Sequence, residues 1–224
     1  MSESHQLVWL KRDIRIRDHR PLRRAAQRGP CIVCYVYEPE RLDQPEIHPA
    51  HLRFINESLR ELDEKLRNRG GALTYRVGRL PDVFQTIHSA HGIDRLWAHE
   101  ETGMGVTFQR DKRVRDWADE QAISFHEIPQ TGVVRGLDDR DGWADHWEER
   151  MSQPLTDPPD PIASAEAIDH QGPRSPGDLG MTDAEKPGRQ HGGESNARDT
   201  LVSFLTERGE PYATSMSSPV TAWD

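Results

Sequence analysis

Short apolar runs alternate with longer amphipathic stretches along the chain as far as Ile128. The apolar runs are rich in β-branched and aromatic side chains, which predicts strands buried on both faces. The stretches between them carry apolar residues every three to four positions, which predicts helices that face a core. The predicted strands are 7–10, 31–37, 72–77, 94–98 and 123–128, and the predicted helices are 20–27, 50–69, a short one around 80–87, and 106–120.

Strands that alternate with helices in this rhythm specify a parallel sheet with right-handed crossovers. The chain is therefore predicted to be an α/β protein with a doubly wound, Rossmann-like, five-stranded parallel sheet of order 3-2-1-4-5. Such sheets bind ligands at the carboxyl ends of their strands, where the strand order reverses. The charged elbow after the first strand, residues 11–19, is expected at that edge. Asp18 is predicted to cap the following helix, with Pro21 in its first turn.

The character of the chain changes after the fifth predicted strand. Residues 141–151 predict one more helix, with Trp143, Trp147 and Met151 on one face. From Ser152 to about Gly193, proline, glycine, aspartate and serine cannot bury enough apolar surface to offset chain entropy, which predicts a mobile surface linker. The predicted organisation is an α/β domain over 1–151, a Pro/Gly-rich linker over 152–193, and a short helical stub over 194–224 that contains a helix at 197–207.

Composition and charge narrow the class of protein. The chain of 224 residues is 34% hydrophobic and 30% charged, which is typical of a globular protein, and its formal net charge is -9. A negative chain is not expected to hold DNA mainly by its phosphates, because nucleic-acid domains carry a basic stripe. No apolar stretch approaches the roughly 20 residues that span a bilayer, and residues 1–5 lack a secretory signal. A cytoplasmic protein without membrane contact is expected.

Three local motifs favour structural roles. Cys31 and Cys34 form a C-x-x-C, but it lies in a predicted strand, where residues three apart face opposite ways, so buried structural thiols are expected. His88 and His91 lie near a helix end without a carboxylate motif that would complete a metal site, so a structural role is expected for both. The loop 103–105 offers backbone N–H groups to an anion, a weak signal that is not a G-x-G-x-x-G.

The segment LVWLKRDIRIRDHRPL, residues 7–22, resembles the opening signature of the DNA photolyase/cryptochrome flavoproteins. The resemblance continues through 101–151 and into the linker, which is similar to the connector that leads to the helical flavin domain in that family. The helix at 197–207 resembles the first helix of the flavin domain, and Tyr212 lies where the family places a tyrosine near the FAD phosphates. Residues 214–219 imitate a flavin-phosphate segment but follow Tyr212 too closely, so they are interpreted as a decoy.

For intact relatives the resemblance implies a lyase that repairs pyrimidine dimers in DNA under blue light, by electron transfer from reduced FAD. It also implies a second chromophore in the α/β domain. This chain is expected to be the antenna-pigment half, truncated before the FAD-binding helices and not competent for repair alone. The pigment candidates are a folate, a deazaflavin or FMN, and stable binding of FAD is not expected. Expected partners are DNA, weakly or not at all, and a separately encoded FAD domain.

The residues expected to contact a pigment follow three strands of the predicted sheet. They are Arg12, Asp13 and Arg15 on the elbow, Tyr37 and Glu38 after strand 2, and Glu100 and Glu101 after strand 4. The alternative for the last pair is an ion pair that merely closes the sheet's edge. No catalytic or metal-ligating set is predicted. The rival functions are a stand-alone nucleotide-binding or regulatory module, which the lack of a Gly/Ser-rich phosphate loop disfavours, and an inert fragment.

Overall fold

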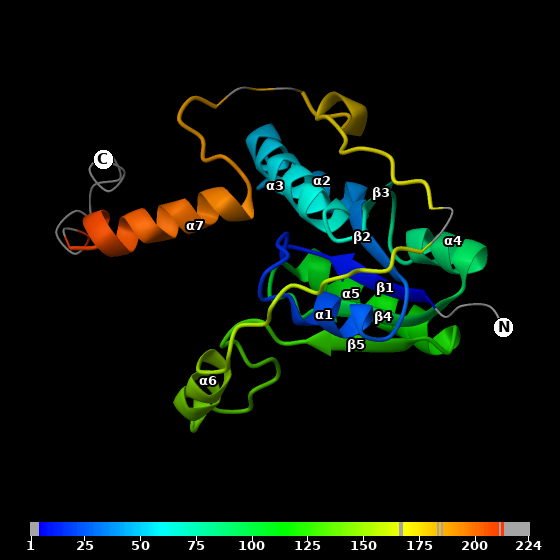
Figure 1. Ribbon diagram of the computed structural model, residues 1–224, viewed down its shortest axis with the longest axis horizontal. Helices are drawn as coiled ribbons and strands as arrows, with labels where there is room; N and C mark the ends of the chain where they lie inside the picture. The colour runs from blue at the N-terminus through cyan, green and yellow to red at the C-terminus, as the bar shows by residue number, and fades with distance from the viewer. Residues whose placement is uncertain (1–4, 166–167, 183, 185, 211, 213–224) are drawn as a thin grey trace.

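Five strands form one parallel sheet at the centre of the molecule (Figure 1). The computed structural model describes residues 5–210 and 212, apart from 166–167, 183 and 185. The strands are β1 (His5–Leu10), β2 (Cys31–Tyr37), β3 (Leu73–Val77), β4 (Ile93–His99) and β5 (Ser124–Ile128). Their order is β3-β2-β1-β4-β5 and every pair is parallel. The predicted fold class and strand order are confirmed.

Helices cover both faces of the sheet. On one face, α1 (Arg20–Ala26) and α3 (Pro49–Arg67) pack against the sheet, and on the other face α4 (Asp82–His91) and α5 (Gly105–Glu120) do so. In the central strand β1, Val8 and Leu10 face the first layer while Leu7 and Trp9 face the second. All four side chains are buried, which is why the sequence shows an unbroken apolar run there instead of an alternating one.

The two cysteines lie in β2 on opposite faces of the sheet, Cys31 toward α1 and α3 and Cys34 toward α4 and α5. Both thiols are free and buried. Burial raises the pKa of each thiol to about 12, which removes the thiolate that redox or metal chemistry needs. The prediction of structural thiols is confirmed.

The start of α1 differs from the prediction. His19, not Asp18, caps the helix, because its Nδ1 atom accepts a hydrogen bond of 3.1 Å from the Leu22 amide. Asp18 has a left-handed backbone with φ of 50°. Its carboxylate accepts from the Thr156 amide at 3.0 Å and its own amide donates to the Thr156 carbonyl at 2.8 Å. Asp18 therefore joins the elbow to a distant segment, which the local pattern does not reveal.

The segment after Ser152 runs across the body of the molecule before it turns back toward α3 (Figure 1). The expectation of a surface linker is wrong for Ile162 and Ala165, which are 2% and 5% exposed. Hydrogen bonds from the Cys31 amide to the Ala163 carbonyl and from the Ala165 amide to the Cys31 carbonyl pair Ser164 in parallel with Cys31, at the start of β2. A side chain at Gly71 would lie 3.0 Å from Ile162, so this glycine permits the close approach. The prolines around this contact hide it from a composition argument.

The remaining helices are α2 (Pro39–Leu42), α6 (Trp143–Met151), the short 3-10 helix Gly177–Leu179 and α7 (Glu194–Ser203), which continues as a π-helical turn, Phe204–Arg208. The predicted apolar face of α6 is largely exposed, and the helix lies away from the sheet. His88 accepts a hydrogen bond from the Ile93 amide, which is the expected structural role. Within the described residues no helix is long and apolar enough to cross a membrane. Residues 214–219 lie outside the described part of the chain.

Candidate ligand site at the carboxyl edge of the sheet

A network of buried charges begins at the end of β1. Lys11 is buried and donates to Asp111 of α5 at 3.0 Å and to Glu127 of β5 at 3.2 Å. Its ammonium nitrogen lies 4.2 Å from the centroid of the Trp9 ring, and the guanidinium carbon of Arg110 lies 4.7 Å from the same ring. Trp9 thus holds two cations against the carboxyl edge of the sheet by cation–π contact.

Arg110 of α5 is the centre of this network. Its guanidinium donates to Glu38 after β2 at 2.7 Å, to Glu101 after β4 at 2.5 Å, and to the neighbouring Asp111 at 2.8 Å. Burial raises the pKa of Glu38, and the charge of Arg110 offsets only part of this effect. One buried guanidinium therefore ties the ends of two strands to a helix.

Arg12 closes the network on the solvent side. Its Nε atom lies 3.0 Å from Oε1 of Glu101, and its side chain is 45% exposed while that of Glu101 is 4% exposed. A side chain at Gly103 would lie 3.2 Å from this carboxylate and 3.3 Å from the Arg12 guanidinium. The absence of a side chain at Gly103 therefore leaves room for this ion pair. Arg12 and Glu101 therefore form an ion pair between the loop after β1 and the loop after β4.

Asp13 lies apart from this network, in a second buried cluster. One of its oxygens accepts from the Lys11 amide at 2.8 Å, and the other lies 2.5 Å from Nδ1 of His99 and 2.9 Å from Nε2 of His19. Burial alone would raise the pKa of Asp13, but its interactions with His19 and His99 outweigh this effect and lower that pKa well below its ordinary value. Burial also lowers the pKa of His99, so Asp13 is the ionised partner and His99 the neutral one.

The cluster of Asp13, His19 and His99 has the spacing of a metal site, with ligand atoms within 4.8 Å of one another. The tautomer of His19 argues against one. Its Nδ1 atom accepts from the Leu22 amide, so the neutral ring carries its hydrogen on Nε2, the atom that faces Asp13. A metal would need the lone pair of that Nε2. The cluster is therefore a carboxylate that holds two imidazoles.

A cavity of about 140 Å³ opens at the carboxyl end of β2. We call it the β2-end cavity. Tyr35, Tyr37 and Glu38 form its strand side, and the apolar side chains Leu42, Ile47, Leu52 and Ile55 line it from α2, α3 and the loop between them, together with Arg41 and His51. Tyr37 is anchored by its hydroxyl, which donates to Asn56 at 2.7 Å. The Nε atom of Arg41 is buried and has no hydrogen-bond partner among the described residues.

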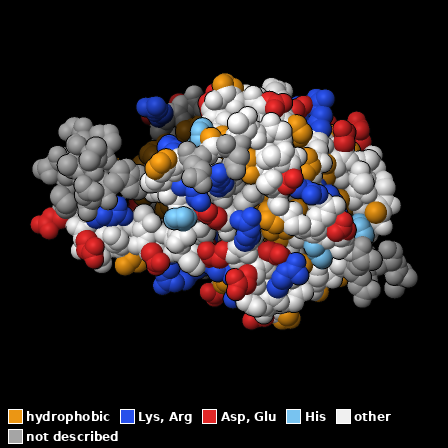
Figure 2. All heavy atoms as spheres, turned by 90° about the horizontal axis from the view of Figure 1, so that it is seen from above, with side chains coloured by type: hydrophobic (Ala, Val, Ile, Leu, Met, Phe, Trp, Pro, Cys, Tyr) orange, Lys and Arg blue, Asp and Glu red, His pale blue; other side chains and the backbone are white. Residues whose placement is uncertain are grey.

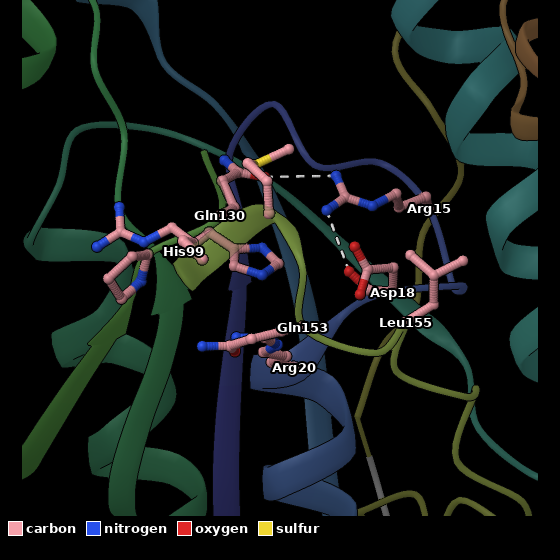
Figure 3. Close-up of a pocket in the computed structure, with 10 residues that line it drawn as sticks. Arg15, Asp18, Arg20, His99, Gln130, Gln153 and Leu155 are labelled. Atoms are coloured by element: carbon pink, nitrogen blue, oxygen red, sulfur yellow. Dashed lines mark hydrogen bonds between the residues drawn. The ribbon is translucent and has the colours of Figure 1, made fainter. Parts of the chain in front are cut away.

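A second, smaller pocket of about 80 Å³ lies beside the elbow (Figure 3). We call it the elbow pocket. Arg15 lines it, held by hydrogen bonds to Gln130 and to the Asp18 carbonyl. His99 lines it from the end of β4. The other lining residues are Asp18, Arg20, Pro129, Gln130, Arg150, Met151, Gln153 and Leu155.

The predicted pigment contacts thus fall into separate places. Tyr37 and Glu38 line the β2-end cavity, Arg15 lines the elbow pocket, Arg12 and Glu101 belong to the charge network, and Asp13 is buried with the histidines. Glu100 is half-buried and contributes its backbone, with its carbonyl accepting from Gln130. Tyr212 lies beyond α7, about half exposed, with its ring against Phe204.

Sequence reasoning missed Arg110, Asp111 and Arg41. All three lie in helices that carry many charges, so their sequence context does not distinguish a buried cation from a solvated one. The one available signal is positional, because each helix follows a strand whose carboxyl end carries an acid or a tyrosine. The histidine contacts of Asp13 were missed because 13, 19 and 99 come together only in the folded chain.

Comparison with known proteins supports this assignment of the fold. The family model for DNA photolyase matches residues 6–138. Cryptochrome-1 of Arabidopsis thaliana is 27% identical over 176 residues, which cover 72% of this chain and 25% of the relative. The deoxyribodipyrimidine photo-lyase of Halobacterium salinarum is 26% identical over 232 residues, which cover 92% of this chain and 47% of the relative. The chain spans about a quarter to half of the length of these relatives.

Solved structures show the same fold. A cryptochrome from Synechocystis superposes with a TM-score of 0.76 at 18% identity, over 96% of this chain and 49% of that one. A class III photolyase from Agrobacterium tumefaciens gives 0.75 at 17% identity, over 96% and 47%. A photolyase from Sulfolobus tokodaii, solved with two FAD molecules, gives 0.63 at 19% identity, over 88% and 45%. Together with the family match over more than half of its length, this likeness shows that the chain belongs to the DNA photolyase family and carries the α/β fold of its photolyases and cryptochromes.

Proposed function

We propose that this chain is the antenna half of a photolyase or cryptochrome system and that its β2-end cavity receives the ring of a light-harvesting pigment. The observation that carries the proposal is the pairing of an aromatic and apolar wall with an unsatisfied buried donor, Nε of Arg41. Such a donor costs about 1 to 3 kcal/mol unless a ligand oxygen or nitrogen accepts from it. Folates, deazaflavins and flavins all present such acceptors on a flat ring. When bound, the pigment would absorb blue light and pass the excitation energy on.

The size of the cavity limits how a pigment binds. A cavity of about 150 Å³ accommodates a single benzene ring, and the β2-end cavity has about 140 Å³. It therefore fits one ring of a pigment as it stands. Binding of a fused ring system requires the loop 43–48 between α2 and α3 to move outward. Most residues of this loop are exposed, so its movement breaks few core contacts.

Fluorescence titration with a folate, a deazaflavin and FMN tests the proposal. We expect saturable binding of one of them and a loss of about 10- to 150-fold in affinity for Arg41→Gln, the range of a charge-assisted hydrogen bond. Arg67→Gln, a matched change at an arginine of α3 that is 55% exposed, is expected to bind like the wild type. Arg15→Ala is also expected to leave pigment affinity unchanged, because Arg15 lines the other pocket. Absence of saturable binding by all three pigments would favour the rival module or the inert fragment.

The proposal also includes weak or absent binding of DNA by this chain and a helical FAD-binding protein as its partner. Figure 2 shows Lys and Arg side chains interspersed with Asp and Glu on the face that it presents, and the chain has a net charge of -9. Both observations support weak or absent DNA binding by this chain alone. Leu201, Val202 and Leu205 of the α7 segment are 55%, 51% and 70% exposed, which supports a helical FAD-binding partner at this end. Pull-down against the FAD domain of a relative, with Leu205→Glu as the weakened variant, tests this part.

A further inference from the structure

The elbow pocket has chemistry that the pigment proposal does not use. Its volume of about 80 Å³ is well below the roughly 300 Å³ at which pockets for drug-sized ligands begin. It is therefore too small for a pigment and large enough for a small ion. Arg15, Arg20 and Arg150 line it against a single carboxylate, that of Asp18. The pocket thus has an excess of positive charge, although the chain as a whole is negative.

The carboxylate in the pocket is already engaged. Asp18 accepts from the Thr156 amide, and its backbone carbonyl accepts from Arg15. Arg15 is oriented by this contact and by Gln130 (Figure 3). Among the described residues, the side chain of Arg20 forms neither a hydrogen bond nor an ion pair, and it lines the pocket. Two guanidinium groups are therefore available to an oxyanion, for which their planar fork is well suited.

His99 favours a ligand that can donate a hydrogen bond. It is 2% exposed, and its Nδ1 atom contacts the ionised Asp13 at 2.5 Å, so Nδ1 carries the hydrogen. Nε2 of the neutral ring then holds a lone pair, and Figure 3 shows the ring at the wall of the pocket. The charged and titratable groups around this ring are Asp13, His19, Arg15, Arg20, Arg150 and Asp18. Burial, with a smaller contribution from the charge of Arg15, lowers the pKa of His99, so a ligand must supply the hydrogen.

We propose that the elbow pocket binds a protonated phosphate group, whose anionic oxygens accept from Arg15 and Arg20 and whose O–H donates to Nε2 of His99. Phosphate combines negative charge with a hydrogen-bond donor near neutral pH. Sulfate has the same shape and charge but no proton to donate. A selective preference for phosphate over sulfate therefore distinguishes this pocket from a general cationic surface. The proposal does not depend on pigment binding in the β2-end cavity.

Two sources can supply such a group, a free inorganic phosphate ion and the terminal phosphate of an oligonucleotide. A terminal phosphate monoester loses its last proton with a pKa of about 6, whereas inorganic phosphate keeps one O–H through pH 8. Binding of a 5′-phosphorylated oligonucleotide at pH 5.5 that disappears at pH 8 would identify the terminal group as an acceptable source. Binding of inorganic phosphate at both pH values, without binding of the oligonucleotide, would identify the free ion.

Isothermal titration calorimetry of the full chain with inorganic phosphate, sulfate and chloride at pH 7.5 and constant ionic strength tests the proposal. We expect saturable phosphate binding, at least about tenfold weaker in Arg20→Gln and in Arg15→Gln, as for loss of a charge-assisted hydrogen bond. Arg24→Gln is the matched control, because Arg24 lies on the same helix, is exposed and does not line the pocket. Phosphate is also expected to shift the Nε2 nitrogen resonance of His99 in the folded wild type.

Three results would overturn the proposal. They are no saturable binding of phosphate, equal binding of phosphate and sulfate at pH 7.5, and an equal loss in Arg24→Gln and Arg20→Gln. Thermal melting of each variant without phosphate shows whether it is folded. Added phosphate should raise the melting temperature of the wild type and of Arg24→Gln, and leave that of folded Arg20→Gln nearly unchanged.

Discussion

The β2-end cavity and the elbow pocket lie at the same edge of one sheet but are assembled differently. The first is lined by residues between Tyr35 and Ile55, that is, by one strand and the two helices that follow it. The second combines residues from the elbow, from the ends of β4 and β5, from α6 and from the segment up to Leu155. The first is aromatic and apolar, whereas the second is cationic and polar. Residues close in sequence can make a pocket by local geometry, but the elbow pocket exists only when distant segments meet.

The two pockets also differ in how their charges are supported. Glu38 in the β2-end cavity forms an ion pair with the buried guanidinium of Arg110. His99 in the elbow pocket depends on the buried carboxylate of Asp13. Each pocket therefore has one buried ionic support, and removal of either support should affect stability before it affects ligand binding.

The largest effect is expected from Arg110→Met. The change leaves Glu38, Glu101 and Asp111 close together without their shared guanidinium, and loss of one partner of a buried ion pair costs about 3 to 5 kcal/mol of unfolding free energy. Urea denaturation measures it. The control is Arg113→Met on the same helix, whose side chain is 34% exposed and pairs with Glu40, and which should cost about 0 to 1 kcal/mol. Equal losses in the two variants would contradict the central role of Arg110.

A smaller effect is expected from Asp13→Asn, a loss of about 1 to 3 kcal/mol of unfolding free energy. The NH2 group of asparagine and the N–H of a histidine are both donors, so one of the two histidine contacts of residue 13 loses its acceptor. The pKa of Asp13 is lowered in the folded protein, so its ionised form stabilises the fold above the unfolded pKa of about 3.9. That contribution is lost as the pH falls through the lower folded pKa. The stability difference between wild type and variant should shrink below about pH 4. A difference that grows below that pH would contradict the assignment of Asp13 as the ionised partner.

The variant Ile47→Trp tests whether the two pockets bind their ligands independently. Ile47 lies in a partly exposed loop, and the larger indole side chain is expected to fill the β2-end cavity. We expect pigment affinity to fall at least about tenfold, equivalent to about 1.4 kcal/mol. Phosphate affinity should remain that of the wild type, because Ile47 does not line the elbow pocket. The same titrations of Arg20→Gln should show the opposite pattern. Parallel loss of both ligands in either variant would mean that the pockets are not independent.

The contrast between the pockets also explains how far sequence reasoning reached. The sheet order followed from the alternation of strands and helices, and Tyr37 and Glu38 could be placed at a pocket because they end a strand. The sequence predicts Arg15 at the same pocket as Tyr37 and Glu38, because the elbow follows β1 and these two residues end β2. In the structure Arg15 lines the elbow pocket, whereas Tyr37 and Glu38 line the β2-end cavity. Arg15 is hydrogen-bonded to Gln130, and the nearby Asp18 is hydrogen-bonded to Thr156. Each of these bonds joins residues that are more than a hundred positions apart in the sequence. No local period encodes such contacts, and the burial of Ile162 within a proline-rich stretch of sequence was missed for the same reason.

The smallest loss of unfolding free energy is expected from Glu57→Gln, at the contact between α3 and the chain after residue 188, outside both pockets. Glu57 pairs with Arg189 and accepts from the Gly192 amide at 2.8 Å. These contacts, with the hydrogen bond from Arg189 first, lower the pKa of Glu57 to about 2. Because the pair is partly exposed, Glu57→Gln should cost only about 0 to 1 kcal/mol.

The pH and protease dependence of Glu57→Gln test this assignment. The contribution of Glu57 should be full above its unfolded pKa of about 4.3 and disappear as the pH falls toward the folded value of about 2. Limited proteolysis should cut the segment around Arg189 faster in the variant while the sheet stays intact. Glu64→Gln on the same helix is the control, since among the described residues no hydrogen bond or ion pair joins the Glu64 side chain to this segment. Destabilisation by several kcal/mol would show that this contact supports the core as strongly as Arg110 does.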